Sequence, residues 1–549
     1  MKRLLSALAC LLAVAAGVCA QQQMDGMHKS SATESASLLS GLGALHHPVA
    51  TKNAEAQRFF DQGLTLVYAF NHDEAIRSFR RAAELDPQMA MAYWGIAYAL
   101  GPNINLDVDP VHEQAAYLAT QQALALAAHA PDNERAYIEA LAKRYSNDPK
   151  ADLKKLAVDY KNAMGALVKR FPNDLDAATL YAESAMDLRP WQLWTADGKP
   201  AEGTEEIVAT LESVLKRDPN HIGAIHYYIH AVEASPHPER ALPYVAKLPA
   251  QVPAAGHLVH MPAHIYERTG DYTAAAQSNR DAARADEAYI KSRGGQGMYP
   301  LMYYNHNLHF ECIAETMAGR YADAIVAAHR LEANVAPAVK EIPMLESFMP
   351  TPTLVLVRFR RWDEIMKLPQ PTREMPITVA LWRFARGVAD AANGRLTDAD
   401  NEQRMFAEVV KTIPADASFG LNPAQAILHI AGNVLAARIA LAKQDNKAGI
   451  ALLRQAVAAE DALAYDEPPA WFLPTRESLG GALLRAGNAA EAEQVFRADL
   501  VQHPHSGRSL FGLRESLKAL GKTREAQQVE QEFTRAWQHA DAQLNVADL

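Results

Sequence analysis

The spacing of small residues, an aromatic residue and proline is the feature that most limits how this chain can fold. Within residues 54–87, one such set stands at fixed intervals: Gly63, Ala75, Phe79, Ala82 and Pro87. Sets with the same frame return along the chain, at Gly270/Tyr272/Ala275, Gly319/Tyr321/Ala324, Gly387/Gly394/Ala399, Gly480/Gly487/Ala492 and Gly521/Ala526. At about 150 residues per domain the chain would make several ordinary domains, but repetition of one small unit accounts for the same length.

This pattern resembles the tetratricopeptide repeat, a unit of 34 residues folded as two antiparallel helices. In that family small residues let the two helices touch, an aromatic residue fills the gap, and proline ends the second helix. The resemblance implies an all-α fold over residues 53–549: a continuous right-handed superhelical solenoid with a concave groove and essentially no strands. The match is strongest in the first unit and the last two, and the C-terminal repeats span about 376–540.

The first twenty residues have the pattern of a secretory signal peptide. Lys2 and Arg3 precede an apolar run over residues 4–18, and Ala20 ends a short segment that suits signal peptidase. We therefore expect cleavage after Ala20, a polar leader over residues 21–52, and a periplasmic or secreted mature protein. No other stretch approaches the ~20 consecutive apolar residues of a membrane helix, so we expect no membrane insertion.

Charge and cysteine content exclude several other classes of protein. Asp and Glu number 64 against 54 Lys and Arg, a net charge of −10 that offers no footprint for a nucleic acid backbone. Cys312 alone lies beyond the signal peptide, so no disulfide within the molecule holds the fold. Cys-x-x-Cys-His, Walker, G-x-S-x-G and H-E-x-x-H motifs are absent from the sequence.

Histidines occupy most of the groove-facing positions in three successive repeats. In the tetratricopeptide family these positions on the first helix face the groove, where packing does not dictate the residue. Nine of them, in a frame counted mainly from Pro219, Pro253 and Gly319, hold seven histidines, and the other two hold Gly223 and Ile313. Chance would place fewer than one histidine there. The seven are His226, His230, His257, His260, His264, His306 and His309.

Histidines in this arrangement predict a transition-metal site. Spacings of three and four residues place side chains on one helix face, and packed helices lie about 8–10 Å apart, so imidazoles from adjacent repeats can meet at one ion. Neutral imidazole is a common ligand of zinc, copper and iron, and the general order of affinities favours copper or zinc over iron. The core ligands that we choose are His226, His230, His260 and His264, and the remaining three (His257, His306 and His309) are further ligands, a second site or outer partners.

Two other uses of the same groove stay open. A metal with an open coordination position could catalyse hydrolysis or oxygen chemistry, with Glu233 or Glu267 as base or ligand-orienting group and Arg268 holding an anion. A metal-free scaffold could instead bind a peptide, because acidic and aromatic residues also take groove positions: Tyr227, Glu183, Asp187, Trp94 and Tyr98. The well-known carboxylate-binding groove of the family uses Lys, Arg and Asn where this chain has histidine.

The function that these observations favour is an exported helical-repeat protein whose groove binds a transition metal, acting as a binding or assembly factor. A metal-dependent hydrolase or oxidoreductase and a peptide-binding scaffold are the alternatives. The segment 465–471, with two consecutive prolines, reads as a rigid connection between repeats, and a loop that caps the groove is the alternative.

Export can be tested on protein recovered from the native host. Mass spectrometry should find Gln21 at the amino terminus, because the charged start, apolar run and small cleavage residues occur together. An intact Met1, or a lipid on Cys19, would contradict the expectation.

Overall fold

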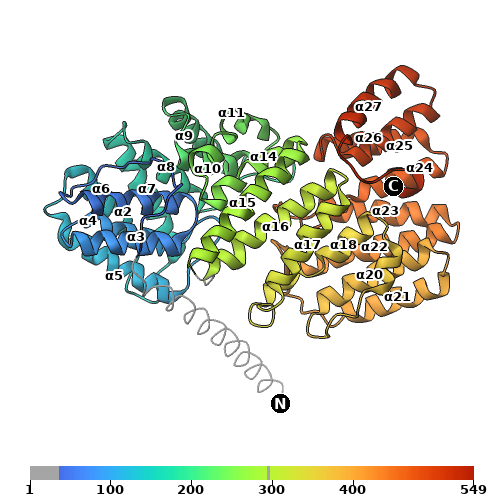
Figure 1. The fold of residues 1–549 in the computed structure, drawn as a ribbon, viewed down its shortest axis with the longest axis horizontal. Coiled ribbons are helices and arrows are strands. Elements are labelled where there is room, and N and C mark those ends of the chain that lie inside the picture. Colours follow the sequence, from blue (N-terminus) through green and yellow to red (C-terminus); the bar gives the residue numbers. More distant parts are fainter. Residues whose placement is uncertain (1–35, 294–296) are drawn as a thin grey trace, which may run out of the picture. The chain divides into compact units, whose positions relative to one another are not determined.

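The computed structural model describes residues 36–293 and 297–549 (Figure 1). The chain divides into two compact units, the first up to Pro262 together with Asp281–Tyr304, the second Ala263–Arg280 together with Asn305–Leu549. The first unit contains α2 Ala54–Tyr68, α3 His72–Leu85, α4 Ala90–Ala99, α5 Pro110–Ala127, α6 Asp132–Leu141, α7 Leu153–Arg170, α8 Leu175–Met186, α9 Thr204–Arg217, α10 Ile222–Val232, η1 Pro238–Ala241, α11 Leu242–Val245, α12 Leu248–Gln251 and α13 Gly256–His260.

Three helices contribute residues to both units: α14 Pro262–Thr269, α15 Tyr272–Arg293 and α16 Met298–Met317. The second unit continues with α17 Tyr321–Val335, η2 Pro343–Phe348, α18 Thr351–Arg358, α19 Trp362–Lys367, α20 Pro376–Ala392, α21 Leu396–Val410, β1 Ser418–Phe419, β2 Asn422–Pro423, α22 Ala424–Ala442, α23 Asn446–Asp461, α24 Thr475–Arg485, α25 Ala489–Gln502, α26 Gly507–Ala519, α27 Thr523–Ala536 and η3 Val546–Asp548. The all-α prediction is confirmed: in the described part of the chain, β1 and β2 form a two-stranded antiparallel pair and every other named element is a helix.

At two places in the described chain, an aromatic ring set between glycines joins one helix pair to the next. Phe79 of α3 lies so close to Gly63 of α2 and Gly95 of α4 that a Cβ on either glycine would stand 2.6 or 2.5 Å from its ring. Phe496 of α25 makes the same contact with Gly480 and Gly512 on the flanking helices, at 2.5 and 2.2 Å. Since close packing leaves no room for a methyl group here, these glycines set the distance between neighbouring helices.

In eight helix pairs of the described chain, the turn holds one residue in the left-handed conformation, two positions before the second helix begins. Five turns place glycine there, with φ between +71° and +83°: Gly270, Gly319, Gly394, Gly487 and Gly521. Three turns instead hold Phe70, Arg360 and Gln444, at φ of 54°, 55° and 65°. The left-handed conformation costs a residue with a Cβ about 1–2 kcal/mol of folding free energy. Phe70, Arg360 and Gln444 bear this cost.

In the first unit, α10 packs against α2 as well as against α8 and α9. All eleven residues of α10 are buried, including His226 and His230. Residues 36–52 of the predicted leader also pack on this unit, because Gln62 bonds Ser37 and Leu39, and His47 bonds Asp176. The face that was expected to line an open groove is therefore buried here.

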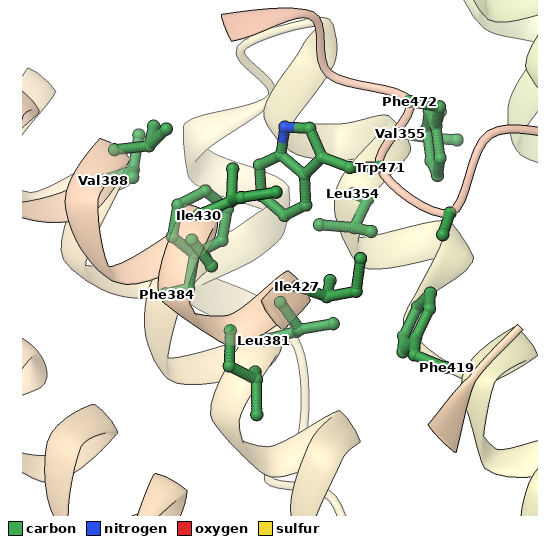
Figure 2. Close-up of a cluster of buried hydrophobic side chains, with 14 of the residues drawn as sticks. Leu354, Val355, Leu381, Phe384, Val388, Phe419, Ile427, Ile430, Trp471 and Phe472 are labelled. Atoms are coloured by element: carbon green, nitrogen blue, oxygen red, sulfur yellow. The ribbon is translucent and has the colours of Figure 1, made fainter. Parts of the chain in front are cut away.

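The second unit has an apolar core formed by α18, α20, α22 and the loop 463–474 (Figure 2). Trp471 of that loop lies edge-on to Phe384 of α20, with ring centroids 5.8 Å apart. Cys312 is fully buried in the same core. Among the described helices, α22 is long and apolar enough to span a membrane, but half of its apolar window is buried inside this unit.

The turn glycines give a direct test of the repeat geometry. A Cβ on Gly394 would meet nothing within 4 Å, so Gly394→Ala changes the backbone energy and not the packing. Because φ is +73° there, the variant should lose about 1 kcal/mol of unfolding free energy in chemical denaturation.

The neighbouring Asn393→Ala is the control, since Asn393 has φ −89° and alanine adopts that conformation without strain. Equal denaturation midpoints for the two variants would show that this turn does not require a left-handed residue.

Candidate metal centre

Three histidines of the first unit converge: His226 and His230, one helical turn apart on α10, and His257 on α13. One ring nitrogen of each lies within 4.8 Å of the others. The three residues are 0%, 6% and 1% exposed, so the group is almost wholly closed off from solvent. A cluster of imidazoles at this separation can bind one metal ion.

His226 is oriented by the end of α2. Its Nδ1 donates to the carbonyl oxygen of Tyr68 at 2.7 Å. A carbonyl only accepts, so Nδ1 carries the proton and Nε2 of the neutral ring carries the lone pair. That Nε2 lies 3.1 Å from Nε2 of His257. Two nitrogens bound to one tetrahedral zinc at about 2.0–2.1 Å lie about 3.3 Å apart, close to the separation found here.

His230 is oriented by a carboxylate. Its Nδ1 donates to Oε1 of Glu233 at 2.7 Å, and both side chains are buried. A carboxylate on the second nitrogen of a ligating histidine fixes the ring and makes Nε2 a stronger base. Glu233, considered above as a base or a ligand-orienting group, therefore has the geometry of the orienting group.

His257 is placed through its main chain. Its N–H donates to Oη of Tyr299 at 3.1 Å, and that hydroxyl donates to Asp286 at 2.9 Å. Asp286 approaches so closely that a Cβ on Gly256 would lie 1.9 Å from its carboxylate. The first residue of α13 must therefore be glycine, because any side chain would displace the carboxylate that anchors Tyr299.

Aromatic rings enclose the three imidazoles. Phe70 contacts His226, His257 and His230, with ring centroids 4.5, 5.3 and 6.2 Å apart. Trp191 lies 5.8 Å from His230 and Tyr303 lies 4.8 Å from His257. Phe70 and Trp191 both have positive φ, at 54° and 60°. Two aromatic residues are thus held in a strained conformation that brings their rings against the histidines.

The other predicted ligands are divided between the two units. His260 stacks on His257 within the first unit, with centroids 5.7 Å apart. His264 and His306 lie together in the second unit, also 5.7 Å apart. His309 packs on Phe348 and Phe472, and burial lowers its pKa to about 3. The group of three in the first unit thus contains His226 and His230 of the predicted core, with His257 beside them.

The predicted groove-lining residues are buried and not solvent-facing: Trp94 (3%), Tyr98 (3%), Tyr227 (1%) and Glu183 (1%) exposed, with Asp187 only partly exposed. The expectation of an accessible acidic and aromatic groove is wrong at these positions. Glu183 accepts from Tyr98 at 2.8 Å, and Asp187 accepts from Arg144 at 2.6 Å. Burial and the nearby Asp187 raise the pKa of Glu183 well above its usual value, although Arg144 opposes the shift.

Glu267 and Arg268 belong to the second unit. Burial raises the pKa of Glu267 from 4.5 to about 8, against the opposing charges of His503 and Arg268. A carboxyl that keeps its proton at neutral pH does not act as a general base there. The guanidinium of Arg268 lies over the ring of Tyr465, 5.8 Å from its centroid.

A second group, His47, Asp174 and Asp176, was not expected from the repeat frame, because His47 lies before the first repeat. Asp176 accepts from His47 at 2.7 Å and from the hydroxyl of Tyr68 at 2.6 Å, and His221 lies 3.3 Å from it. Burial would raise the pKa of Asp176, but these hydrogen bonds and the two histidines hold it well below the usual range. Its oxygens are engaged by protein donors, so the group ties the leader to α2 and α8.

Comparison with known proteins agrees with the helix pairs. A sequence model of the tetratricopeptide repeat matches residues 56–89, which cover most of α2 and all of α3. Residues 56–89 therefore form a tetratricopeptide repeat. No curated protein matches the sequence of the chain.

Solved structures similar to this chain include the human IFIT1 dimer with m7Gppp-AAAA. The identity is 12%, the match covers 89% of this chain and 91% of that chain, and the TM-score is 0.35. Yeast Tom70 has the same identity, with 88% and 98% covered and a TM-score of 0.29. At these scores the likeness carries no argument about what this chain binds.

The raised pKa of Glu267 predicts a pH effect on stability. Between about pH 4.5 and pH 8 the folded protein keeps a proton that the unfolded chain has lost, so this residue makes unfolding easier as pH rises. Glu267→Gln copies the protonated side chain. Its advantage in unfolding free energy over the wild type should grow from pH 5 to pH 8, by at most about 1.4 kcal/mol per pH unit.

Denaturation curves at pH 5, 6.5 and 8 measure this difference, and Glu532→Gln on the exposed face of α27 controls for loss of a charge. A constant difference across the three pH values would contradict the burial effect.

Proposed function

We propose that this tetratricopeptide repeat protein is an exported binding protein that holds one transition metal ion at His226, His230 and His257. The observation that carries the proposal is the pairing of the two Nε2 atoms of His226 and His257 at 3.1 Å, with the outer nitrogen of His226 held by a carbonyl. Export rests on the signal-peptide pattern of residues 1–20.

The outer hydrogen bonds support metal binding more than a simple histidine cluster. His226 and His230 each donate Nδ1–H to an oxygen, so both present Nε2 to the same point. Metal-bound histidines in proteins almost always make such an outer hydrogen bond. Three imidazoles leave a fourth position of a tetrahedral ion open, and the affinity order favours copper or zinc over iron.

The repeat architecture supports a binding or assembly role. Tetratricopeptide repeats generally bind proteins or peptides, and their helix pairs hold side chains on a rigid frame. The site lies where α10 meets α2, and a bound ion would join α10 to α13 through His226 and His257, 31 positions apart in the sequence. Metal binding would thereby stabilise the first unit against unfolding.

Metal binding is tested by calorimetry and elemental analysis on protein purified without an affinity tag. We expect about one equivalent of copper or zinc per chain. Affinity should fall below about pH 6, because each imidazolium must lose its proton to bind.

Two variants distinguish a histidine that binds the metal from a carboxylate that only orients a histidine. His226→Asn places an amide where Nδ1 stood, so it can still donate to Tyr68, but it removes Nε2 and should abolish binding. Glu233→Gln retains the shape of the partner of His230 but not its charge, and should weaken binding about 10–100-fold. Helicity measured by circular dichroism should stay at the wild-type level in both.

His309→Asn is the matched control, because His309 is also buried but contacts Phe348 and Phe472. It should bind metal as the wild type does, and so should His129→Asn on the surface. No saturable binding of copper, zinc or iron at neutral pH would refute the proposal, and loss of binding in His309→Asn would move the site to the second unit.

A further inference from the structure

The second unit contains a cavity of about 410 Å³, lined by residues of α18, α20, α22, α24, α26 and the loop 463–474. All of its lining residues belong to this unit. The volume lies within the range of about 300–1,000 Å³ that is usual for small-molecule sites in proteins. The chemistry of the walls therefore indicates what kind of molecule the cavity suits.

Three of the five arginines in the lining are paired with carboxylates. Arg358 donates to both oxygens of Glu477, and Arg508 donates to the same carboxylate from Nε at 2.7 Å. Arg360 pairs with Asp548. Glu477 and Asp548 are the two carboxylate side chains of the lining, and both are therefore already engaged by arginines.

The other two arginines are held by residues 546–549 and by α24. Arg438 donates to the main-chain oxygen of Leu549 at 3.1 Å and to Oγ of Ser478 at 2.8 Å. Arg485 donates to the main-chain oxygens of Val546 at 2.9 Å and Leu549 at 3.3 Å. Leu549 is fully buried and lies where an anion between these two guanidinium groups would bind. Each of the five guanidinium groups thus already has an oxygen partner within the chain.

Two hydrogen-bond donors of the lining have no acceptor in the described part of the chain. The hydroxyl oxygen of Ser478 accepts from Arg438, and a hydroxyl can donate its own proton at the same time. The Nε–H of Arg358 is buried without a partner, and this residue is 6% exposed. Because buried polar groups are normally paired, the lining favours a ligand that carries a hydrogen-bond acceptor.

Much of the remaining wall is apolar. Trp471 of the loop and Phe384 of α20 lie edge-on to each other there, with ring centroids 5.8 Å apart, and Val388 lies near them (Figure 2). The same lining includes Trp362, Val434 and Leu441. Burial of an apolar ring system against these side chains is favourable, because it removes apolar surface from water.

The positive charge of the lining favours an aromatic body over a saturated one. The guanidinium of Arg360 lies over the ring of Trp362, 5.7 Å from its centroid, so an arginine and an aromatic face already meet in this lining. The face of an aromatic ring carries partial negative charge and attracts cations although the ring is neutral. A neutral aromatic ligand therefore gains from the arginines without replacing their present partners.

From these contacts we propose that the cavity of the second unit binds a small, neutral, planar aromatic molecule with an acceptor oxygen such as a carbonyl. The aromatic body packs on Trp471, Phe384 and Val388. The acceptor oxygen receives the hydrogen bond of the Ser478 hydroxyl. This site is independent of the histidine site, whose three residues belong to the first unit.

Calorimetry with coumarin, a neutral and planar bicyclic lactone, tests the proposal on the full chain. We expect saturable binding with a Kd below about 1 mM. Octahydrocoumarin keeps the lactone but is not planar, and should bind at least about fivefold more weakly because it loses the aromatic contacts. Coumarin-3-carboxylate adds a negative charge and should bind no more tightly than coumarin, since the arginines are already paired.

The variant Ser478→Ala removes the hydroxyl that is assigned to the ligand. It should weaken coumarin binding about fivefold, the usual effect of one lost hydrogen bond. The affinity for 1,2-dihydronaphthalene, which has the same ring frame without oxygen, should stay unchanged in this variant.

The variant Val388→Phe fills part of the cavity and should weaken the binding of both probes at least about tenfold, with helicity unchanged in circular dichroism. Val326→Phe on α17 is the matched control, because Val326 is 57% exposed and lies outside the lining. It should bind coumarin as the wild type does.

The opposite results would overturn the proposal. Absence of saturable coumarin binding would exclude this class of ligand, and equal affinity for octahydrocoumarin would show that the lining does not select a planar ring. Tenfold tighter binding of coumarin-3-carboxylate would show that the arginines recognise an anion. Unchanged binding in a folded Val388→Phe protein would place the ligand outside the cavity, and equal losses for both probes in Ser478→Ala would assign that hydroxyl a structural role only.

Discussion

The close approach of α10 to α2 is the contact on which the histidine site depends. A Cβ on Gly223 would lie 2.5 Å from the ring of Tyr68, so only glycine lets the two helices meet. Tyr68 then serves two networks, because its carbonyl orients His226 and its hydroxyl bonds Asp176. Without this approach, the imidazoles of α10 would face a groove, and nothing from α2 would set which nitrogen carries the proton.

The histidine site is built at a turn where the repeat departs from its own preference for glycine. Glycine is the residue of least strain at these turns, yet Phe70 and Arg360 occupy two of them. The ring of Phe70 contacts the three histidines, and Arg360 lines a cavity of the second unit and pairs with Asp548. A residue with a Cβ costs about 1–2 kcal/mol at such a position, so in each case the strain places a side chain that the glycine turns lack.

Burial changes the chemistry of several residues that the repeat frame identified. His226 and His230 were predicted on one face of a helix, and the structure places them there, with His257 beside them. The frame did not predict that this face is closed. Glu267 was a candidate base, but in a buried setting it keeps its proton at neutral pH. The frame treats each helix pair alone, whereas desolvation depends on which later helix covers the pair.

The sequence by itself determined the helix pairs, the glycine turns and the face on which the histidines lie, because these follow from the local period of small and aromatic residues. Tertiary structure decided the rest. It brought α10 onto α2, placed His309 against Phe348 and Phe472, and gathered Arg358, Arg438 and Arg508 around one cavity. These outcomes depend on contacts between residues far apart in the chain, and a repeat of 34 residues contains no information about how its copies close on one another.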